Sequence, residues 1–142
     1  MKISMILLCF LISITASAQE DWSLKRSTLK MKETAPVWPG CESDSPTKIN
    51  ACFNKMLVKH IQKNFKYPAA EYKKNIQGEV VVDFIINTKG LVEIKSATGG
   101  NKGLQDAAKK IISLIPKMRP AMFGGKPSAV PYIVPLNYKT GK

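Results

Sequence analysis

The sequence predicts an α+β domain of two layers, in which a three-stranded sheet carries two helices on one face. Three observations support this fold class. Apolar residues recur at spacings of three and four in two stretches, they alternate with other residues in three shorter stretches, and the resulting order is helix, strand, strand, helix, strand. A tight turn joins the first two strands, so these two are expected to be antiparallel. A single helix between the second and third strands permits either direction.

The first helix is expected to begin at a well-defined cap. Ser45 is a suitable N-cap, and Pro46 fits the first helical position. The helix ends before Tyr67 and Pro68, because proline cannot continue it. Its buried stripe is predicted to consist of Ile49, Cys52, Phe53, Met56, Leu57, His60, Ile61 and Phe65.

The first two strands follow Gly78 and form a hairpin. The loop from Asn87 to Gly90 joins them, and Gly90 supplies the position that needs a positive φ. Val92 and Ile94 continue in the second strand. One face of the first strand is made of Val80, Val82, Phe84 and Ile86.

The second helix and the last strand complete the domain. Asn101 is the expected N-cap of this helix, and Pro116 stops it. A turn-rich segment at residues 120–127 then leads to a final strand from Val130 to Tyr138. The helix is expected to bury Leu104, Ala107, Ala108, Ile111, Ile112 and Ile115.

The N-terminus has the pattern of a cleavable secretory signal peptide. Lys2 precedes an apolar run from Ile3 to Ile14, and Ala16, Ser17 and Ala18 form a small-residue cleavage site. The alternative is a retained anchor helix, and only in that case is contact with the membrane expected. The chain therefore divides into a signal peptide (1–18), an extended lead-in (19–45) and the folded domain (46–142).

Two cysteines, Cys41 and Cys52, remain after the signal peptide. Export places them in an oxidising compartment, which favours a disulfide worth about 3 kcal/mol of stability. The alternatives are free thiols and a metal site, but zinc needs four ligands and the chain adds only one histidine, His60. We expect His60 to have a structural role and expect neither a metal nor a cofactor.

The net charge of +12 raises the question of a nucleic-acid partner. Export argues against one, and the chain has no finger spacing, no aromatic RNA-binding motif and no dense basic helix. The positive surface therefore either aids solubility or meets anionic components of the cell envelope.

The motifs of common enzymes are absent from the sequence. Acidic residues are few and scattered, the stretch from Gly99 to Gly103 lacks the spacing of a phosphate-binding loop, and no G-x-S-x-G motif occurs. The sequence therefore predicts a binding module and not an enzyme.

The last strand contains two prolines that distinguish its two edges. Residues two apart direct their N–H and C=O groups toward the same edge of a strand, and proline has no N–H to donate. The edge with the prolines should therefore be open. It either resists aggregation or accepts a guest strand through four carbonyls and the donors of Ile133 and Asn137. This edge comprises Pro131, Ile133, Pro135 and Asn137.

The order of elements and several short motifs resemble the C-terminal domain of TonB, the energy transducer with which Gram-negative bacteria open outer-membrane transporters. The resemblance runs from about Asn64 to Lys139. Pro39-Gly40-Cys41-Glu42, together with Cys52, resembles versions from Bacteroidetes. The other matching motifs are Tyr67-Pro68-Ala69, Ile76-Gln77-Gly78, Val80-x-Val82-x-Phe84 and Gly90-Leu91-Val92.

The resemblance implies a periplasmic domain that supports energy-coupled transport. Its partner would be a TonB-dependent outer-membrane transporter, contacted at its plug and at its TonB box, a short extended segment that the family binds as an extra strand. The resemblance assigns partner contacts to the Tyr-Pro region and to the last strand, namely to Asn64, Tyr67, Pro68, Ile133, Val134, Pro135 and Asn137.

The chain departs from the family pattern in three places. Pro131 and Pro135 remove two donors from the edge that the TonB box would use. The family motif commonly reads Gln-Pro-x-Tyr-Pro, whereas this chain has Asn64-Phe65-Lys66-Tyr67-Pro68. A full TonB also has a membrane helix followed by a long Pro-rich spacer, whereas residues 19–45 reach only about 90 Å when fully extended. Two alternatives to a soluble binding domain therefore stay open: a short transducer that keeps its anchor, and an envelope module that binds cell wall or forms a homodimer.

Overall fold

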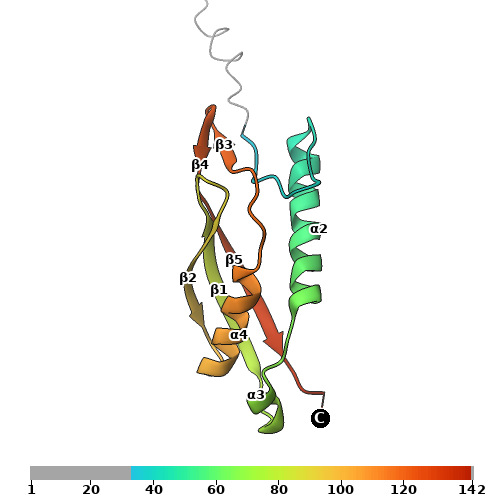
Figure 1. The fold of residues 1–142 in the computed structure, drawn as a ribbon, viewed down its shortest axis with the longest axis vertical. Coiled ribbons are helices and arrows are strands. Elements are labelled where there is room, and N and C mark those ends of the chain that lie inside the picture. Colours follow the sequence, from blue (N-terminus) through green and yellow to red (C-terminus); the bar gives the residue numbers. More distant parts are fainter. Residues whose placement is uncertain (1–32, 142) are drawn as a thin grey trace, which may run out of the picture. The chain divides into compact units, whose positions relative to one another are not determined.

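Figure 1 shows the computed structural model, which describes residues 33–141. The expected signal peptide, residues 1–18, and the first part of the lead-in lie outside the described residues. The presence of a three-stranded sheet with two long helices confirms the α+β fold class. The elements are α2 (Pro46–Asn64), α3 (Ala69–Lys73), β1 (Gly78–Ile86), β2 (Val92–Thr98), α4 (Lys102–Ser113), β3 (Ala121–Phe123), β4 (Lys126–Ser128) and β5 (Val130–Tyr138).

The main sheet has the strand order β2-β1-β5, and both pairings are antiparallel. The direction of the last strand, which the sequence left open, is thereby settled. Gly78 to Ile86 of β1 pair without a break with Tyr138 to Val130 of β5. The pairing of β1 with β2 shifts between Asp83 and Phe84. Within the described residues, β2 and β5 are the two edges of this sheet.

The core lies between the sheet and the two long helices. Val80, Val82, Phe84 and Ile86 of β1 are completely buried, as their alternation predicts. Both helices cover this same face: α4 packs on β1 and β2, while Phe53 of α2 stacks on Tyr132, which in turn stacks on Phe84. Figure 1 shows α4 in front of the strands and α2 to the right of the sheet.

The helix ends agree with the sequence, although one cap is made differently. Ser45 is the N-cap of α2 and Pro46 opens the helix, but the Ser45 side chain makes no capping hydrogen bond. At α4, the Oδ1 atom of Asn101 accepts a hydrogen bond of 3.0 Å from the N–H of Leu104. This bond satisfies one of the free donors of the first turn.

The described part of the lead-in is tied to the domain at three points. Its backbone pairs with residues 119–122 through reciprocal hydrogen bonds of Thr34 and Val37. Trp38 is buried against Phe53 and His60 of α2. The expected disulfide joins the lead-in to α2, and its two residues are Cys41 and Cys52.

The structure adds three features that the sequence did not indicate. The polar bridge after Pro68 forms the short helix α3, and the segment read as turns at residues 120–127 contains the β3–β4 hairpin. The third feature is the pairing of the lead-in with residues 119–122. Helix α3 and the hairpin strands are too short for a periodic pattern, and a pairing between distant segments leaves no local signal.

Candidate functional site

The open edge of β5 follows from hydrogen bonds on the opposite side of β1. The N–H of Asn87 donates to the carbonyl of Leu91, on the side of β1 that faces β2. Because directions alternate along a strand, Ile86 and every second residue before it direct their N–H groups toward β5. Their partners in β5 are the even-numbered residues, from Val130 to Tyr138. The odd-numbered residues therefore direct their polar groups away from the sheet.

This assignment places the two prolines on the open edge, as the sequence predicts. Pro131 and Pro135 lie opposite Ile85 and Val81 at positions where β1 requires no donor. The edge then offers four carbonyls but only two N–H groups, those of Ile133 and Asn137. Val134 belongs to the other set, because it pairs with Val82 and its side chain is half-buried.

The side chains of the same edge residues point to the sheet face opposite the helices. All four are exposed, and Ile133 is the most exposed large apolar residue of the described chain, at 69%. Next to them lie the half-buried Val81 and Ile85 of β1. A strand added at this edge would thus also meet an apolar strip.

The Tyr-Pro region lies beside the C-terminal end of β5. Contacts within the domain hold its tyrosine in place. The hydroxyl of Tyr67 donates a hydrogen bond of 2.6 Å to the carbonyl of Ile76, and its ring packs edge-on against Tyr72 and Tyr138. Burial, with smaller effects of the Glu71 carboxylate and Tyr72, raises the pKa of Tyr67. Pro68 is the N-cap of α3.

Asn64 and His60 form a polar link between the two long helices. The ring Nε2 of His60 lies 2.9 Å from the carbonyl oxygen of Ile111 in α4. The amide of Asn64 donates to the backbone carbonyl of His60 at 2.8 Å and lies 3.3 Å from its Nδ1. His60 therefore has the structural role expected for it, and Asn64 supports the last turn of α2.

A groove runs between this region and α4, and it brings together three of the residues assigned by resemblance: Asn64, Tyr67 and Pro68. Its volume is about 510 Å³. The sequence did not single out the α4 side of the groove or its lysines. The only local signal was the basic character of the sequence around Tyr67, which includes Lys63 and Lys66. The other lining residues are Lys63, Lys66, Gly103, Asp106, Ala107, Lys110, Ile111 and Leu114.

The two regions meet at Tyr138, the last residue of β5. Its ring stacks on Phe65 at 4.9 Å and meets Tyr67 at 5.4 Å. The side chain is fully buried, and its hydroxyl has no hydrogen-bond partner among the described residues. Burial, with a smaller effect of Tyr67, raises the pKa of Tyr138 to about 12.

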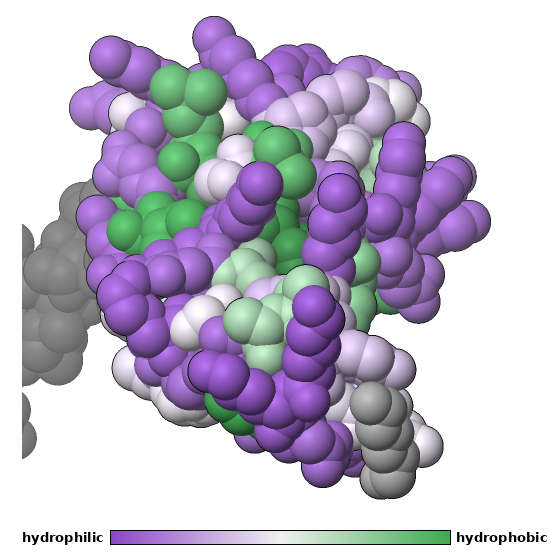
Figure 2. Space-filling model, turned by 60° about the horizontal axis from the view of Figure 1, so that its bottom comes forward, coloured by the Kyte–Doolittle hydropathy of each residue, from purple (hydrophilic) through white to green (hydrophobic). Residues whose placement is uncertain are grey.

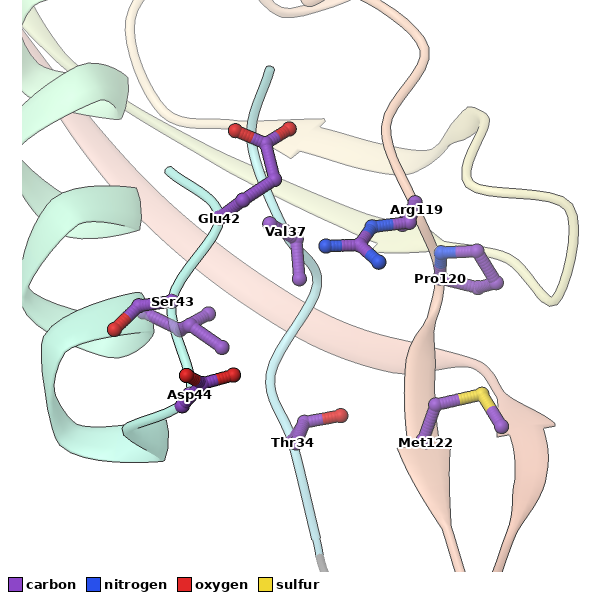
Figure 3. Close-up of a pocket in the computed structure, with 9 residues that line it drawn as sticks. Thr34, Val37, Glu42, Ser43, Asp44, Arg119, Pro120 and Met122 are labelled. Atoms are coloured by element: carbon purple, nitrogen blue, oxygen red, sulfur yellow. The ribbon is translucent and has the colours of Figure 1, made fainter. Parts of the chain in front are cut away.

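A second cavity lies at the opposite end, between the lead-in and the segment before β3. Figure 3 shows Glu42 and Asp44 on one side and Arg119 on the other, with Thr34 and Met122 in the lower part of the view. Its volume is about 670 Å³. In the part of the chain that the structure describes, no carboxylate comes within ion-pair distance of Arg119. Nor do three His, Cys, Asp or Glu residues gather there in a way that could hold a metal ion.

The fold and the open edge define a small α+β domain with a sheet edge that another chain can reach. Comparison with known proteins then identifies the family. The family described as Gram-negative bacterial TonB protein C-terminal matches residues 63–140, more than half of the chain. The chain belongs to this family. A comparison with curated proteins gave no match.

Two solution structures of the Helicobacter pylori TonB C-terminal domain are similar to this chain. The longer one is 20% identical with a TM-score of 0.44, and the similarity covers 69% of this chain and 96% of the other. The shorter one is 22% identical with a TM-score of 0.38, over 63% and 95% of the two chains.

The family in general is periplasmic, non-enzymatic and part of energy transduction for transport, and its domains interact with outer-membrane transporters. Within residues 33–141, no helix is long and apolar enough to span a membrane.

Proposed function

We propose that this domain binds an extended segment of a TonB-dependent outer-membrane transporter as an extra strand along β5 and thereby supports energy-coupled transport. The observation that carries this proposal is the open edge of β5, where four carbonyls and two N–H groups have no partner in the sheet. A guest strand that met all of them would form six hydrogen bonds, each worth about 0.5–1.5 kcal/mol net.

The two prolines make this edge more selective than an edge on which every residue had an N–H donor. A guest must supply donors to all four carbonyls, so it cannot carry proline at the positions that face β5. It finds donors only at Ile133 and Asn137. Pairing with an arbitrary strand is weakened by the two missing donors, which accounts for both roles of the prolines, protection and recognition.

The remaining assigned residues support this partner contact in different ways. Asn64, Tyr67 and Pro68 line the groove beside the end of β5, where they would meet a part of the transporter other than the segment added to β5. The backbone groups of Val134 pair with β1, so they are not free for a guest strand. Val134 contributes only by its position between two edge residues, Ile133 and Pro135.

Substitutions on the open edge test the proposal. We expect Ile133→Pro to weaken the binding of a transporter TonB-box peptide about three- to tenfold, since it removes one of two donors. Pro135→Val restores a donor and should strengthen binding by a similar factor. Ile133→Val, which keeps the donor and the branched side chain, is the matched control. Titration calorimetry gives the affinities, and equal affinities for all four chains would contradict strand addition.

We further propose that the protein is released into the periplasm by cleavage after Ala18. The apolar run from Ile3 to Ile14 and the small residues after it support this. Mass spectrometry of the protein from cells should show a chain that begins at Gln19. An intact N-terminus in the membrane fraction would instead favour the anchored short transducer.

A further inference from the structure

The groove between α4 and the end of α2 has a charge that strand addition at β5 does not explain. Three lysines line it: Lys63 at the last turn of α2, Lys66 in the linker, and Lys110 on α4. Among the described residues, none of the three has a carboxylate within ion-pair distance. The carboxylate that lines the groove, Asp106, is already paired with Lys102 at 2.8 Å. The groove thus presents excess positive charge.

The wall of the same groove is apolar. Ala107 and Ile111 of α4 line it together with Tyr67 and Pro68, and Leu114 follows the end of α4 with 53% of its surface exposed. A volume of about 510 Å³ is in the range of roughly 300–1,000 Å³ that is typical of ligand sites. Figure 2 brings this end of the molecule forward, and apolar surface appears there between hydrophilic side chains.

The walls of the groove are fixed by internal contacts, so its shape does not depend on a ligand. His60 joins α2 to α4, and Tyr67 is bonded to Ile76. On the α4 side, Asn101 donates to the carboxylate of Glu71 at 3.3 Å, and this carboxylate lies against Gly103. A preformed apolar groove with a cationic rim favours an occupant that combines an apolar group with negative charge.

We propose that this groove binds an acidic polypeptide segment in which one bulky apolar side chain is flanked by carboxylates. The apolar side chain lies between Ala107 and Pro68, and the carboxylates meet the lysines at the rim. This interaction is independent of the open edge of β5, so the domain has two separate contact surfaces. The net positive charge, +12 for the chain before the proposed cleavage, adds long-range attraction for such a segment.

A short synthetic peptide with glutamates around one phenylalanine is the probe, and the protein is the exported form of the full chain. We expect Lys63→Glu with Lys110→Glu to weaken binding by about tenfold or more. Lys55→Glu with Lys59→Glu makes the same charge change on exposed positions of α2 outside the groove, and it should change affinity far less. Ala107→Trp, which fills the groove, and Leu114→Glu at its exposed end should each weaken binding by about tenfold.

Two comparisons keep this proposal separate from strand addition. The edge variant Ile133→Pro should leave binding of the acidic peptide unchanged, and the groove variants should leave binding of a TonB-box peptide unchanged, which also shows that they are folded. The proposal is overturned if a peptide without the phenylalanine binds equally well, if the two lysine pairs lose affinity equally, or if Ile133→Pro abolishes binding. Failure of the TonB-box peptide alone removes strand addition and leaves the groove proposal standing.

Discussion

Tyr67 makes a hydrogen bond and two ring contacts within its own domain. Its hydroxyl closes the loop to Ile76, and its ring packs edge-on against both Tyr72 and Tyr138. Its sequence position, next to a proline at the end of a helix, is equally compatible with packing alone. Tyr67 therefore supports the groove wall, and a partner in the groove could reach only the part of its ring that lines the groove.

The two neighbouring tyrosines, Tyr67 and Tyr138, should respond oppositely to loss of their hydroxyls. Tyr67→Phe removes a hydrogen bond and leaves the carbonyl of Ile76 without its donor, so it should lower the free energy of unfolding by about 1 kcal/mol. Tyr138→Phe removes a buried hydroxyl without a partner and should raise that free energy by up to about 1–2 kcal/mol. Urea unfolding followed by circular dichroism measures both, and two changes of the same sign would contradict this account.

Alkaline pH should destabilise the domain through buried tyrosines. Burial raises the pKa of Tyr132 and of Tyr138 from the usual 10 to about 12. Between these values the unfolded chain loses the protons that the folded chain keeps, so stability is full below pH 10 and falls as pH rises toward 12. The double variant Tyr132→Phe/Tyr138→Phe should remove most of this fall. An unchanged fall in denaturant titrations of the variant would assign the effect to other groups.

At the scale of elements, the β1–β2 hairpin is locked to the segment that follows α4. The backbone N–H of Met118 donates to the carbonyl of Gly90 at 3.0 Å. A Cβ at position 90 would overlap the Met118 carbonyl oxygen. The sequence identified Gly90 only by its turn conformation, because the close approach depends on how the later segment packs.

A comparison of two glycines with nearly equal φ separates the energetic cost of a positive φ from the cost of disturbing this contact. Gly90 and Gly125 have φ of +78° and +77°, but nothing lies within 4 Å of a Cβ at Gly125. Gly125→Ala should therefore cost only the strain of a positive φ, about 1–2 kcal/mol. Gly90→Ala should cost about 1–3 kcal/mol more, because the Met118 backbone must move. Thermal unfolding of the two variants provides the comparison, and equal losses would show that the contact is unimportant.

The sequence was sufficient for the elements with strong patterns. The alternation from Val80 to Ile86, the caps at Ser45 and Asn101, and the spacing of Pro131 and Pro135 each determine something local, and the structure agrees with all of them. The groove is different, because it exists only where α2 and α4 pack together. Nothing in the local pattern around Lys110 and Leu114 marks them until the fold places them in one groove with Pro68.

At the scale of the whole molecule, we propose two binding surfaces on one small domain. The open edge of β5 would bind backbone groups of a guest strand, and it is an edge of the main sheet. The groove would bind charge and an apolar side chain, and residues of α2 and α4 line it. Tyr138 ends β5 and contacts Phe65 and Tyr67, so it connects the two surfaces. A transporter segment on β5 and an acidic segment in the groove could therefore be held at the same time.

The central claim is that a guest strand adds to the open edge of β5, and amide hydrogen exchange measures it most directly. The isotope-labelled chain from Gln19 onward is titrated with a TonB-box peptide, and exchange is followed at each amide by NMR. We predict that the amides of Ile133 and Asn137, which face away from β1 and exchange rapidly in the free domain, become protected on binding. Protection along β2 instead, or binding that leaves both amides exchanging as before, would contradict the account.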